Sequence, residues 1–283
     1  MNFKERFQQI TREQNSLLCV GLDPDMRRLP ESIKSDPDPL FKFCSEIIDS
    51  TKHVAAAFKP NFAFFGAHGS KGWAALEKLV DLIPDNIIKL ADAKRADIGS
   101  TSEMYARAIF ENLGFDAVTV NPYLGRDSVE PFLQWPEKGA FILGITSNPG
   151  SKDFQHLQVG SEPVYKIVIR QVTENWNSQN NCGLVVGATH PEELAEVRKL
   201  APGIPFLIPG IGAQGGDLEQ SVLNGTDESG GLALYNSSRG IIYKSSGNDF
   251  AEAAGREAEL LKNQINEIRK SKKLVRRRPA EDC

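Results

Sequence analysis

Residues 87–97 of this 283-residue chain read IIKLADAKRAD, an apolar run that ends in an acid, a base and a second acid. The apolar part predicts a strand. Because it is nearly continuous rather than alternating, it indicates burial on both faces, as in a parallel sheet covered by helices. Seven further runs of this kind occur along the chain. The eight predicted strands are Leu17–Leu22, Val54–Lys59, Ile87–Asp92, Ala117–Val120, Ala140–Ile145, Gly183–Val186, Pro205–Ile208 and Leu232–Tyr235.

Helical patterns separate the predicted strands. They lie at Leu40–Thr51, Trp73–Ile83, Ser102–Asn112, Ser128–Trp135, Val164–Trp176, Pro191–Leu200 and Leu218–Leu223, with Phe3–Gln14 before the first strand and Phe250–Arg269 after the last. Eight strands with helical connections over about 250 residues match an α/β fold, the (β/α)8 TIM barrel. We expect one catalytic barrel domain over residues 1–270, with its N-terminal helix closing the bottom. Residues 271–283 contain three consecutive arginines and are expected to form a charged, disordered tail.

The composition excludes several classes of protein. The formal net charge of −4 argues against a general nucleic-acid binder, whose footprint is normally basic. The four cysteines form no CxxC pair and the four histidines show no metal-ligand spacing, so we expect neither a metal site nor a disulfide framework. No segment is apolar enough for a membrane span or a secretory signal. The protein is therefore expected in the cytoplasm, without nucleic-acid or membrane partners.

A barrel places its catalytic and binding groups just beyond the C-terminal ends of the strands. Asp92 and Lys94 are two residues apart, so a regular strand would point both into the barrel and Ala93 away from it. Lys59 ends the second strand and is expected to reach the same mouth. The acids that flank Lys94 favour its charged form, which predicts a cation and proton donor rather than the neutral amine of a Schiff base. A structural ion-pair network is the simpler alternative.

The loop after this strand carries the second acid, Asp97. The sequence Ser100-Thr101-Ser102-Glu103 then reads as a capping box that starts the next helix, with Thr101 as the alternative cap. The predicted helix thus follows the charged residues within a few positions.

Residues 208–216 read IPGIGAQGG and contain a formal G-x-G-x-x-G at 210–215. The dinucleotide fingerprint belongs to an open sheet, whereas eight uninterrupted βα units form a barrel. In a barrel, the loops after the seventh and eighth strands are the usual phosphate site, with backbone N–H groups as donors. Arg239 follows the eighth strand and can clamp a phosphate with two hydrogen bonds. Together these features predict a phosphate site, although the glycine run alone would be interpreted as a plain turn.

Six motifs along almost the whole chain resemble a known family, the orotidine 5'-phosphate decarboxylases, and FKPNFAFFGAHG and TSNPGS resemble its longer-chain branch. The motifs are VGLDPD, FKPN, DAKRADI, TSNPGS, PGIGAQGG and SSRGIIY. The resemblance implies decarboxylation of orotidine 5'-phosphate to UMP and CO2 in de novo pyrimidine biosynthesis, without a metal or organic cofactor. It further implies that the C6 carbanion is stabilised electrostatically and protonated by Lys94.

The resemblance also assigns roles to the matching residues. Lys59, Asp92, Lys94 and Asp97 would form a charged tetrad. Asp97 and Thr101 would reach into the active site of a partner subunit, which implies a homodimer. The substrate-binding residues would be Asp23 and Lys59 for the ribose hydroxyls, Ser147 for the pyrimidine amide edge, Gln214 for base and phosphate, and Arg239 for the phosphate.

Three other functions fit parts of the pattern. A Mg²⁺-dependent sugar-phosphate decarboxylase or aldolase uses the same barrel and an Asp-x-Lys-x-x-Asp motif, and full activity after chelation would exclude it. A dinucleotide-dependent oxidoreductase would bind NAD. A phosphate-ligand binding barrel without catalysis would release no CO2 from orotidine 5'-phosphate, and it has no evident use for Lys94 between two acids.

Overall fold

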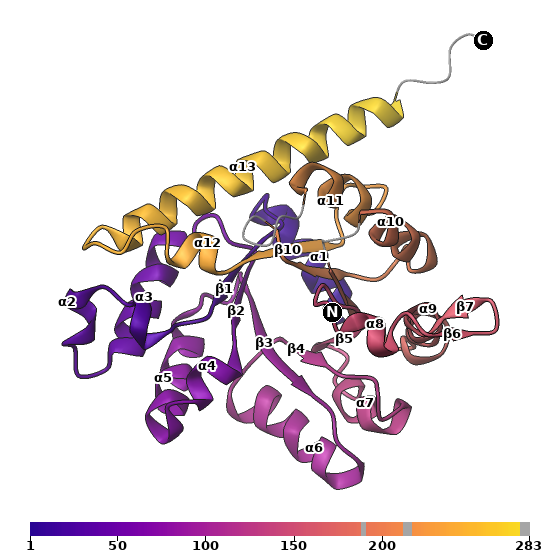
Figure 1. Cartoon of the computed structure of the whole chain (residues 1–283), viewed down its shortest axis with the longest axis horizontal. Helices are drawn as coiled ribbons and strands as arrows, with labels where there is room; N and C mark the ends of the chain where they lie inside the picture. The colour runs from indigo at the N-terminus through magenta and orange to yellow at the C-terminus, as the bar shows by residue number, and fades with distance from the viewer. Residues whose placement is uncertain (188–190, 212–216, 278–283) are drawn as a thin grey trace.

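The computed structural model describes residues 1–187, 191–211 and 217–277. Eight parallel strands form a closed barrel in the order β1-β10-β9-β8-β5-β4-β3-β2, and helices surround it (Figure 1). The strands are β1 (Leu18–Leu22), β2 (Ala57–Pro60), β3 (Ile88–Arg95), β4 (Ala117–Val120), β5 (Gly139–Ile145), β8 (Cys182–Val186), β9 (Phe206–Pro209) and β10 (Ala233–Ser237). The predicted (β/α)8 barrel is therefore confirmed.

The predicted strands all exist, but some of their ends differ. β2 begins at Ala57 rather than at Val54, and β3 continues three residues past its predicted end to Arg95. A small antiparallel hairpin was not predicted. It joins β6 (Gln158–Val159) to β7 (Glu162–Pro163), outside the barrel.

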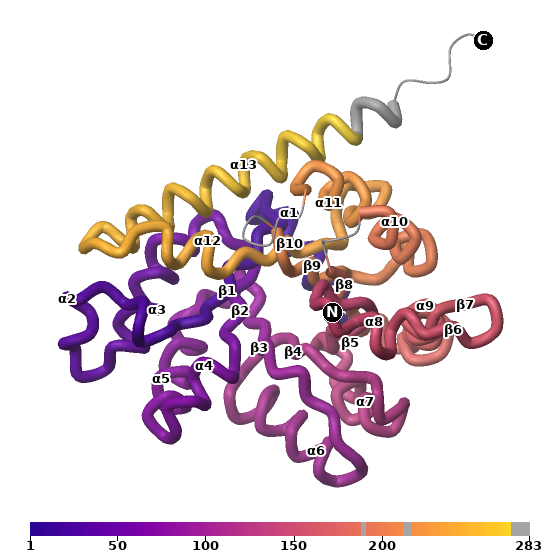
Figure 2. The backbone as a smooth tube through the Cα atoms, in the orientation of Figure 1, coloured from indigo at the N-terminus to yellow at the C-terminus, as the bar shows by residue number. Residues whose placement is uncertain are grey.

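Helices alternate with the strands along the chain, as the tube in Figure 2 shows. They are α1 (Phe3–Glu13), η1 (Met26–Arg28), α2 (Glu31–Lys34), α3 (Pro39–Thr51), α4 (Phe62–Gly66), α5 (Gly69–Leu82), α6 (Gly99–Arg107), η2 (Ala108–Asn112), α7 (Arg126–Leu133), α8 (Ser151–Phe154), α9 (Val164–Arg170), η3 (Gln171–Trp176), α10 (Pro191–Leu200), α11 (Leu218–Gly225), α12 (Arg239–Ile242) and α13 (Phe250–Arg277). Among the helices with described side chains, none combines the length and apolarity that a membrane span requires.

The capping box predicted at residues 100–103 is wrong. α6 begins at Gly99, after Ile98 as N-cap, and no side chain caps it. Gly99 has a positive φ of 53°, a conformation that glycine adopts without a steric penalty. The chain therefore enters the helix earlier than predicted, and Ser100 and Thr101 lie inside its first turn.

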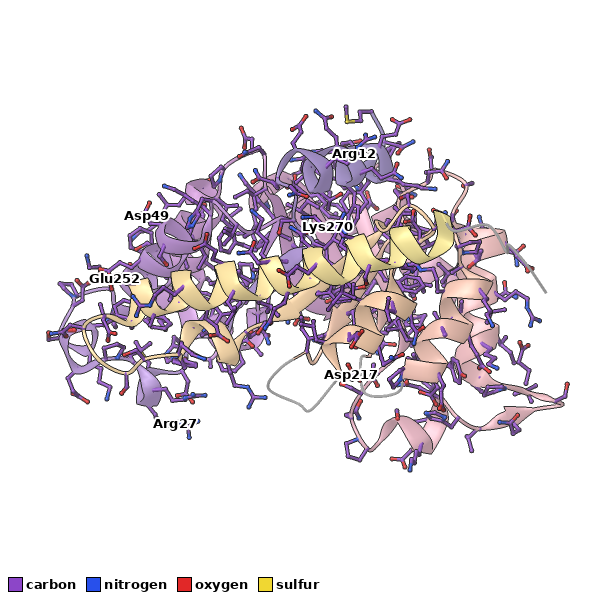
Figure 3. The ribbon with its side chains drawn as sticks, turned by 90° about the horizontal axis from the view of Figure 1, so that it is seen from above. Arg12, Arg27, Asp49, Asp217, Glu252 and Lys270 are labelled. Atoms are coloured by element: carbon purple, nitrogen blue, oxygen red, sulfur yellow. The ribbon has the colours of Figure 1, made fainter. Side chains whose placement is uncertain are left out.

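The lower part of the barrel interior is apolar, and α1 closes it. Phe3 and Phe7 pack against an inner cluster formed by alternate strand residues: Cys19, Ala57, Ile88, Leu90, Ala117, Phe141, Val185, Leu207 and Leu234. The Phe3 ring lies edge-on to the Phe141 ring, with centroids 5.9 Å apart. The backbone N–H of Phe3 donates to Pro136 O at 2.8 Å. The expectation that the N-terminal helix closes the bottom is confirmed. Figure 3 shows Arg12 of α1 at one end of the molecule and Arg27 and Asp217 toward the other.

The last helix is longer than predicted. α13 runs to Arg277 rather than ending at Arg269, so residues 271–277 of the expected tail are helical, and 278–283 lie outside the described residues. The helix crosses one side of the barrel over α3, α11 and α12 (Figure 1).

Candidate active site

The mouth of the barrel is lined by polar side chains that continue the inward-facing positions of the strands. Strand residues alternate between two faces, so the next inward positions lie two residues beyond the apolar cluster. These positions hold Lys59 on β2, Asp92 on β3, Thr119 on β4 and Asn236 on β10. The apolar interior thus changes to a polar layer at the C-terminal ends of the strands, where barrels carry their sites.

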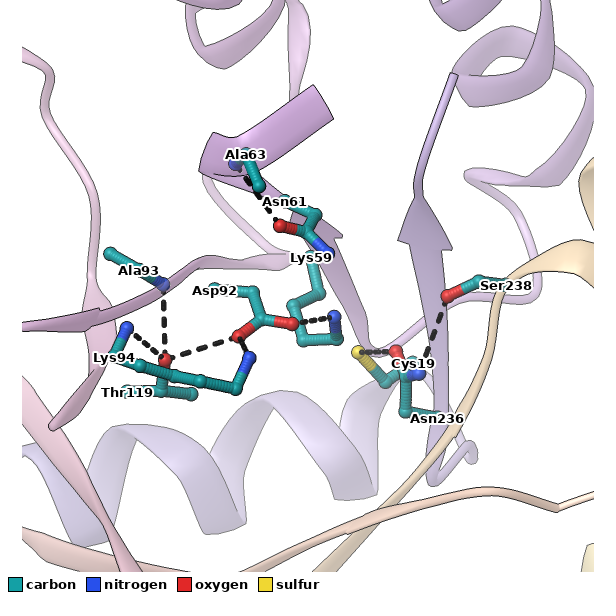
Figure 4. A network of polar contacts seen from close by, with 10 residues as sticks. All are labelled: Cys19, Lys59, Asn61, Ala63, Asp92, Ala93, Lys94, Thr119, Asn236 and Ser238. Atoms are coloured by element: carbon teal, nitrogen blue, oxygen red, sulfur yellow. Dashed lines mark hydrogen bonds and ion pairs between the residues drawn. The ribbon is translucent and has the colours of Figure 1, made fainter. Parts of the chain in front are cut away.

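Two lysines converge on one carboxylate in this layer (Figure 4). Lys59 Nζ lies 2.6 Å from Asp92 Oδ2, and Lys94 Nζ lies 2.5 Å from Asp92 Oδ1. The side chains of Lys59 and Asp92 are only 5% and 11% exposed, whereas that of Lys94 is 53% exposed. Lys59 is thus a buried partner of the carboxylate, and Lys94 can meet a ligand in the mouth.

The buried pair is held in its charged form. Burial acts to lower the pKa of Lys59, but the carboxylates of Asp92 and Asp23 outweigh it and raise that pKa above its ordinary value. Burial acts to raise the pKa of Asp92, but Lys59 and Lys94 outweigh it and lower this pKa to about 2. At neutral pH the layer therefore carries an ionised carboxylate between two cations.

Lys94 reaches Asp92 through a bulge, so the predicted regular strand is wrong here. Lys94 has a φ of 46°, in the left-handed region that non-glycine residues rarely adopt. The register of β3 against β4 shifts between Ala91 and Arg95. The two side chains still meet, but because the backbone turns at Lys94 and not because alternate residues share a face.

A cavity of about 170 Å³ opens beside the buried pair. It brings together residues from the ends of five strands, β1, β2, β3, β9 and β10: Asp23, Lys59, Asp92, Pro209, Gly210, Ile211, Asn236, Ser237, Ser238 and Arg239. Asp23 Oδ1 is buried there and has no hydrogen-bond partner among the described residues, and such an acceptor is costly unless a ligand donates to it. The backbone around Asp23 is fixed by Tyr243, whose hydroxyl donates to Asp23 O at 3.1 Å and accepts from Asp25 N at 2.6 Å.

Residues 209–211 at the end of β9 and residues 236–239 at the end of β10 form the other wall of this cavity. Gly210 has a φ of 98°, and the strand pairing of β9 with β10 sets it beside Ser238 and Arg239. Gly21 on β1 allows this close approach, because a Cβ there would lie 1.8 Å from Ser238 Oγ. Arg239 is exposed and begins α12. The predicted residue Gln214 lies outside the described residues.

Ser147 follows β5 and lies against the end of β8. A Cβ added to Gly187 would approach Ser147 N to 2.9 Å, so glycine is needed for this contact. Gln155 fixes the same loop, since its side chain accepts from Thr146 N and donates to Thr146 Oγ1, both at 2.8 Å. Ser147 does not line the 170 Å³ cavity.

Asp97 and Thr101 are not brought to the charged layer within one chain. Asp97 Oδ1 accepts from Ile98 N at 2.8 Å, and Thr101 is exposed on the first turn of α6. Among the described residues, no ion pair joins Asp97 to Lys59 or Lys94. A single chain therefore brings together three members of the predicted tetrad, Lys59, Asp92 and Lys94.

The mouth of the barrel offers two carboxylates, the ammonium groups of Lys59 and Lys94, and the guanidinium of Arg239. Over the described part of the chain, no three His, Cys, Asp or Glu side chains gather into a metal-binding group. A larger hollow of about 690 Å³ lies between α11, α12 and α13, but no buried ionised side chain faces it. Buried charge, rather than cavity size, identifies the mouth as the candidate active site.

Sequence reasoning missed Thr119 and Tyr243. Thr119 could have been found because it lies two residues beyond Ala117 on the same strand and so faces the same interior. Tyr243 had no such signal, since its contact with Asp23 joins residues 220 positions apart.

The chain is similar to known proteins over most of its length. The sequence profile described as "Orotidine 5'-phosphate decarboxylase / HUMPS family" matches residues 16–254. A relative from Azoarcus sp. (strain BH72), named orotidine 5'-phosphate decarboxylase, is 48% identical over 272 residues, covering 95% of this chain and all of the relative. One of the same name from Christiangramia forsetii is 49% identical, covering 94% and 97%. The solved structure of Leishmania donovani OMP decarboxylase superposes with a TM-score of 0.82 at 39% identity, covering 95% and 99%.

Proposed function

The chain belongs to the orotidine 5'-phosphate decarboxylase/HUMPS family, and from this membership we propose that it converts orotidine 5'-phosphate to UMP and CO2 in de novo pyrimidine biosynthesis. The observation that carries the proposal is the convergence of Lys59 and Lys94 on Asp92 beside a cavity that also contains Asp23 and Arg239. A site that binds a nucleotide needs polar or charged groups for its ribose, its ring and its phosphate, and these residues supply such groups at the mouth of the barrel.

Lys94 performs the chemical step in this proposal. The bond between C6 and the carboxylate carbon breaks, CO2 leaves, and the electron pair stays on C6 in the plane of the ring. An ammonium about 4 Å from this charge stabilises it by roughly 4 kcal/mol at an effective dielectric near 20. Lys94 then donates its proton to C6 and regains one from solvent. Its exposed side chain, held at one end by Asp92, is suited to this role.

Asp92 and Lys59 prepare the site before substrate arrives. Asp92, ionised and fixed between two cations, orients Lys94 and places negative charge near the substrate carboxylate. Because these charges are already in place, little reorganisation is needed during the reaction, which is the main source of electrostatic catalysis.

The remaining cavity residues bind the substrate. Asp23, whose buried oxygen has no partner in the described part of the chain, and Lys59 take the ribose hydroxyls, and Arg239 clamps the phosphate. Ser147 takes the pyrimidine amide edge, and Gln214 bridges base and phosphate. Since the phosphate lies away from C6, its binding energy can be used to hold the reacting ring in place.

A homodimer completes the site. Asp97 and Thr101 of one subunit reach the charged layer of the other, which accounts for their distance from the layer within one chain. Close to them in the sequence, Ile98 and Met104 are large apolar side chains that are exposed in the single chain. A dimer interface would cover such side chains.

We further propose that residues 1–270 act as one catalytic domain, that the enzyme works in the cytoplasm, and that it needs no metal or cofactor. The buried free thiols of Cys19, Cys44 and Cys182 suit a reducing compartment. The Mg²⁺-dependent sugar-phosphate alternative is not favoured, because eight relatives at 45–49% identity are named orotidine 5'-phosphate decarboxylases.

The proposal is tested by following orotidine 5'-phosphate spectrophotometrically with and without EDTA. Full turnover in both conditions is expected. If neither condition gave turnover, the proposed reaction would be wrong. If EDTA abolished the turnover, the metal-dependent alternative would be favoured instead.

Lys94→Ala should abolish turnover, since it removes both the cation and the proton donor. The affinity for UMP, measured by calorimetry, should stay within about threefold, because the ribose and phosphate contacts remain. Retained turnover would show that another group protonates C6.

A further inference from the structure

We propose that Thr119 is a positioning residue for the reaction: its hydroxyl holds the bulge that sets the ammonium of Lys94 on Asp92. The inference rests on the proposed decarboxylation and adds a residue that acts through Lys94 rather than on the substrate. Thr119 lies on β4, faces the barrel interior and is 2% exposed.

The bulge leaves two backbone amides without partners in the strand ladder. Ala91 pairs with Val118 and Arg95 with Val120, so the three residues 92–94 of β3 stand opposite Thr119 alone. Thr119 Oγ1 accepts from Ala93 N at 3.0 Å and from Lys94 N at 2.9 Å (Figure 4). One hydroxyl thus replaces the acceptors that a regular ladder would supply to these partly buried N–H groups.

The same hydroxyl also contacts the carboxylate. Thr119 Oγ1 donates to Asp92 Oδ1 at 3.2 Å, and this is the oxygen that Lys94 Nζ contacts. A hydroxyl has one donor and two acceptor positions, so all three are used. Thr119 therefore joins the backbone of Lys94 to the carboxylate that receives its side chain.

Lys94 needs such a support. Its φ of 46° is unfavourable for a residue with a Cβ, and more than half of its side chain is exposed, so packing does not fix it. Without the Thr119 hydroxyl, the backbone at Lys94 can relax and its ammonium can leave the position over Asp92. An error of about 1 Å in such a group can cost on the order of 100-fold in rate.

The test compares three variants. Thr119→Val removes the hydroxyl and keeps the volume, Thr119→Ser keeps the hydroxyl, and Thr51→Val is the matched control. Thr51 is also buried, but its hydroxyl donates to Ile47 O within α3, away from the mouth.

In Thr119→Val, kcat should fall by roughly 10- to 100-fold while KM and the Kd for UMP stay within about threefold. Thr119→Ser should keep kcat within about threefold of the wild type, and Thr51→Val should leave kcat unchanged. A Thr119→Val enzyme with wild-type kcat, or a Thr119→Ser enzyme as slow as the valine variant, would overturn the inference. So would an equal loss of UMP affinity and kcat, because that indicates general distortion of the mouth.

Two measurements keep the inference separate from folding and from the proposed function. If valine prevents folding, Thr119→Ala serves instead, since it leaves room for a water to accept from the two amides, and the same loss of kcat is expected. Hydrogen exchange at Ala93 N and Lys94 N should quicken in the valine and alanine variants but not in Thr119→Ser, whatever the enzyme acts on. Unchanged exchange would overturn the role of Thr119, whereas a wild type inactive on orotidine 5'-phosphate would overturn only the proposed function.

Discussion

Lys59 and Asp92 keep each other charged at the mouth of a barrel whose lower interior is apolar. Either group alone would be costly to bury, and removing one partner leaves an uncompensated charge. A buried ion pair adds little net stability compared with apolar residues of the same volume. The presence of the Lys59–Asp92 pair is therefore better explained by a function that needs fixed charges. Lys94 adds a second cation at the side of Asp92 that faces the mouth.

The lowered pKa of Asp92 predicts a pH dependence of stability. A carboxyl group whose pKa falls to about 2 on folding contributes stability above its unfolded value of about 3.9, and loses this contribution as the pH falls toward 2. The advantage of the wild type over Asp92→Asn should thus be constant from pH 5 to 7 and shrink below pH 4, by about 2 kcal/mol in total.

Urea unfolding at a series of pH values measures this difference. Asp49→Asn is the control, because Asp49 pairs with Lys52 on the exposed surface, where water screens the interaction. If the stability advantage of the wild type over Asp92→Asn grew as the pH fell, the charged state assigned to Asp92 would be contradicted.

At the residue scale, the sequence identified the charged members of the site but missed the neutral Thr119 and Tyr243. Lys59 and Asp92 stand out because charged residues seldom end buried strands. A threonine in a strand is ordinary, so Thr119 gave no comparable signal. The bulge at Lys94 was not predicted, because the alternation of side chains between two faces holds only in a regular strand.

At the scale of elements, α13 fastens the loop between α11 and β10. Lys272 Nζ donates to Leu223 O at 2.6 Å and to Thr226 O at 2.9 Å, which places a cation on the C-terminal carbonyls of α11. Arg269 Nε donates to Gly230 O at 2.6 Å. From the other side, the buried Arg198 donates to Gly225 O and Leu232 O. The polar stretch 224–230 is thus held by cations from two helices.

Lys272→Met should lower the free energy of unfolding by about 1–3 kcal/mol, because buried carbonyls lose a charged donor. Turnover should be unchanged, since the contact is far from the mouth. Chemical denaturation measures the first and the decarboxylase assay the second. Lys270→Met is the matched control, as Lys270 is exposed on the same helix (Figure 3). Equal stability of the two variants would contradict the role of Lys272.

Apolar periodicity predicted which segments are helical, but it did not predict where the helices end or where their turns become irregular. The predicted helix at Ser102–Asn112 passes into a π-helical turn, η2, and that at Val164–Trp176 passes into η3. These turns depend on packing around them, which periodicity does not contain. The hairpin of β6 and β7 was missed because each strand has two residues, too few to show a period.

At the scale of the whole molecule, barrel closure brings the two halves of the site together. β1 pairs with β10, residues more than 200 positions apart, so that Cys19 lies opposite Asn236. The number and order of the strands predicted this closure, because eight βα units close into a barrel. The contents of the cavity were predictable from strand ends, whereas contacts such as Tyr243 with Asp23 arise only once the barrel is closed.

The proposed dimer predicts complementation between inactive variants. Lys94→Ala and Asp97→Ala homodimers should both be nearly inactive, since each site lacks one member of the tetrad. In a mixed dimer, one site has both residues and the other has neither. Unfolding and refolding an equal mixture should restore about one quarter of wild-type activity, because half of the dimers are mixed and each has one intact site.

Activity is measured after mixing, with each variant refolded alone as the control. No recovery, while sedimentation shows mixed dimers, would place Asp97 in the site of its own subunit.

The left-handed backbone at Lys94 has a consequence for how such a protein can evolve. Glycine or asparagine would suit this conformation better than lysine, so selection for heat tolerance alone would favour their codons at position 94. Purifying selection on growth without external pyrimidines would oppose them. This chain therefore carries at position 94 a residue that its own backbone disfavours.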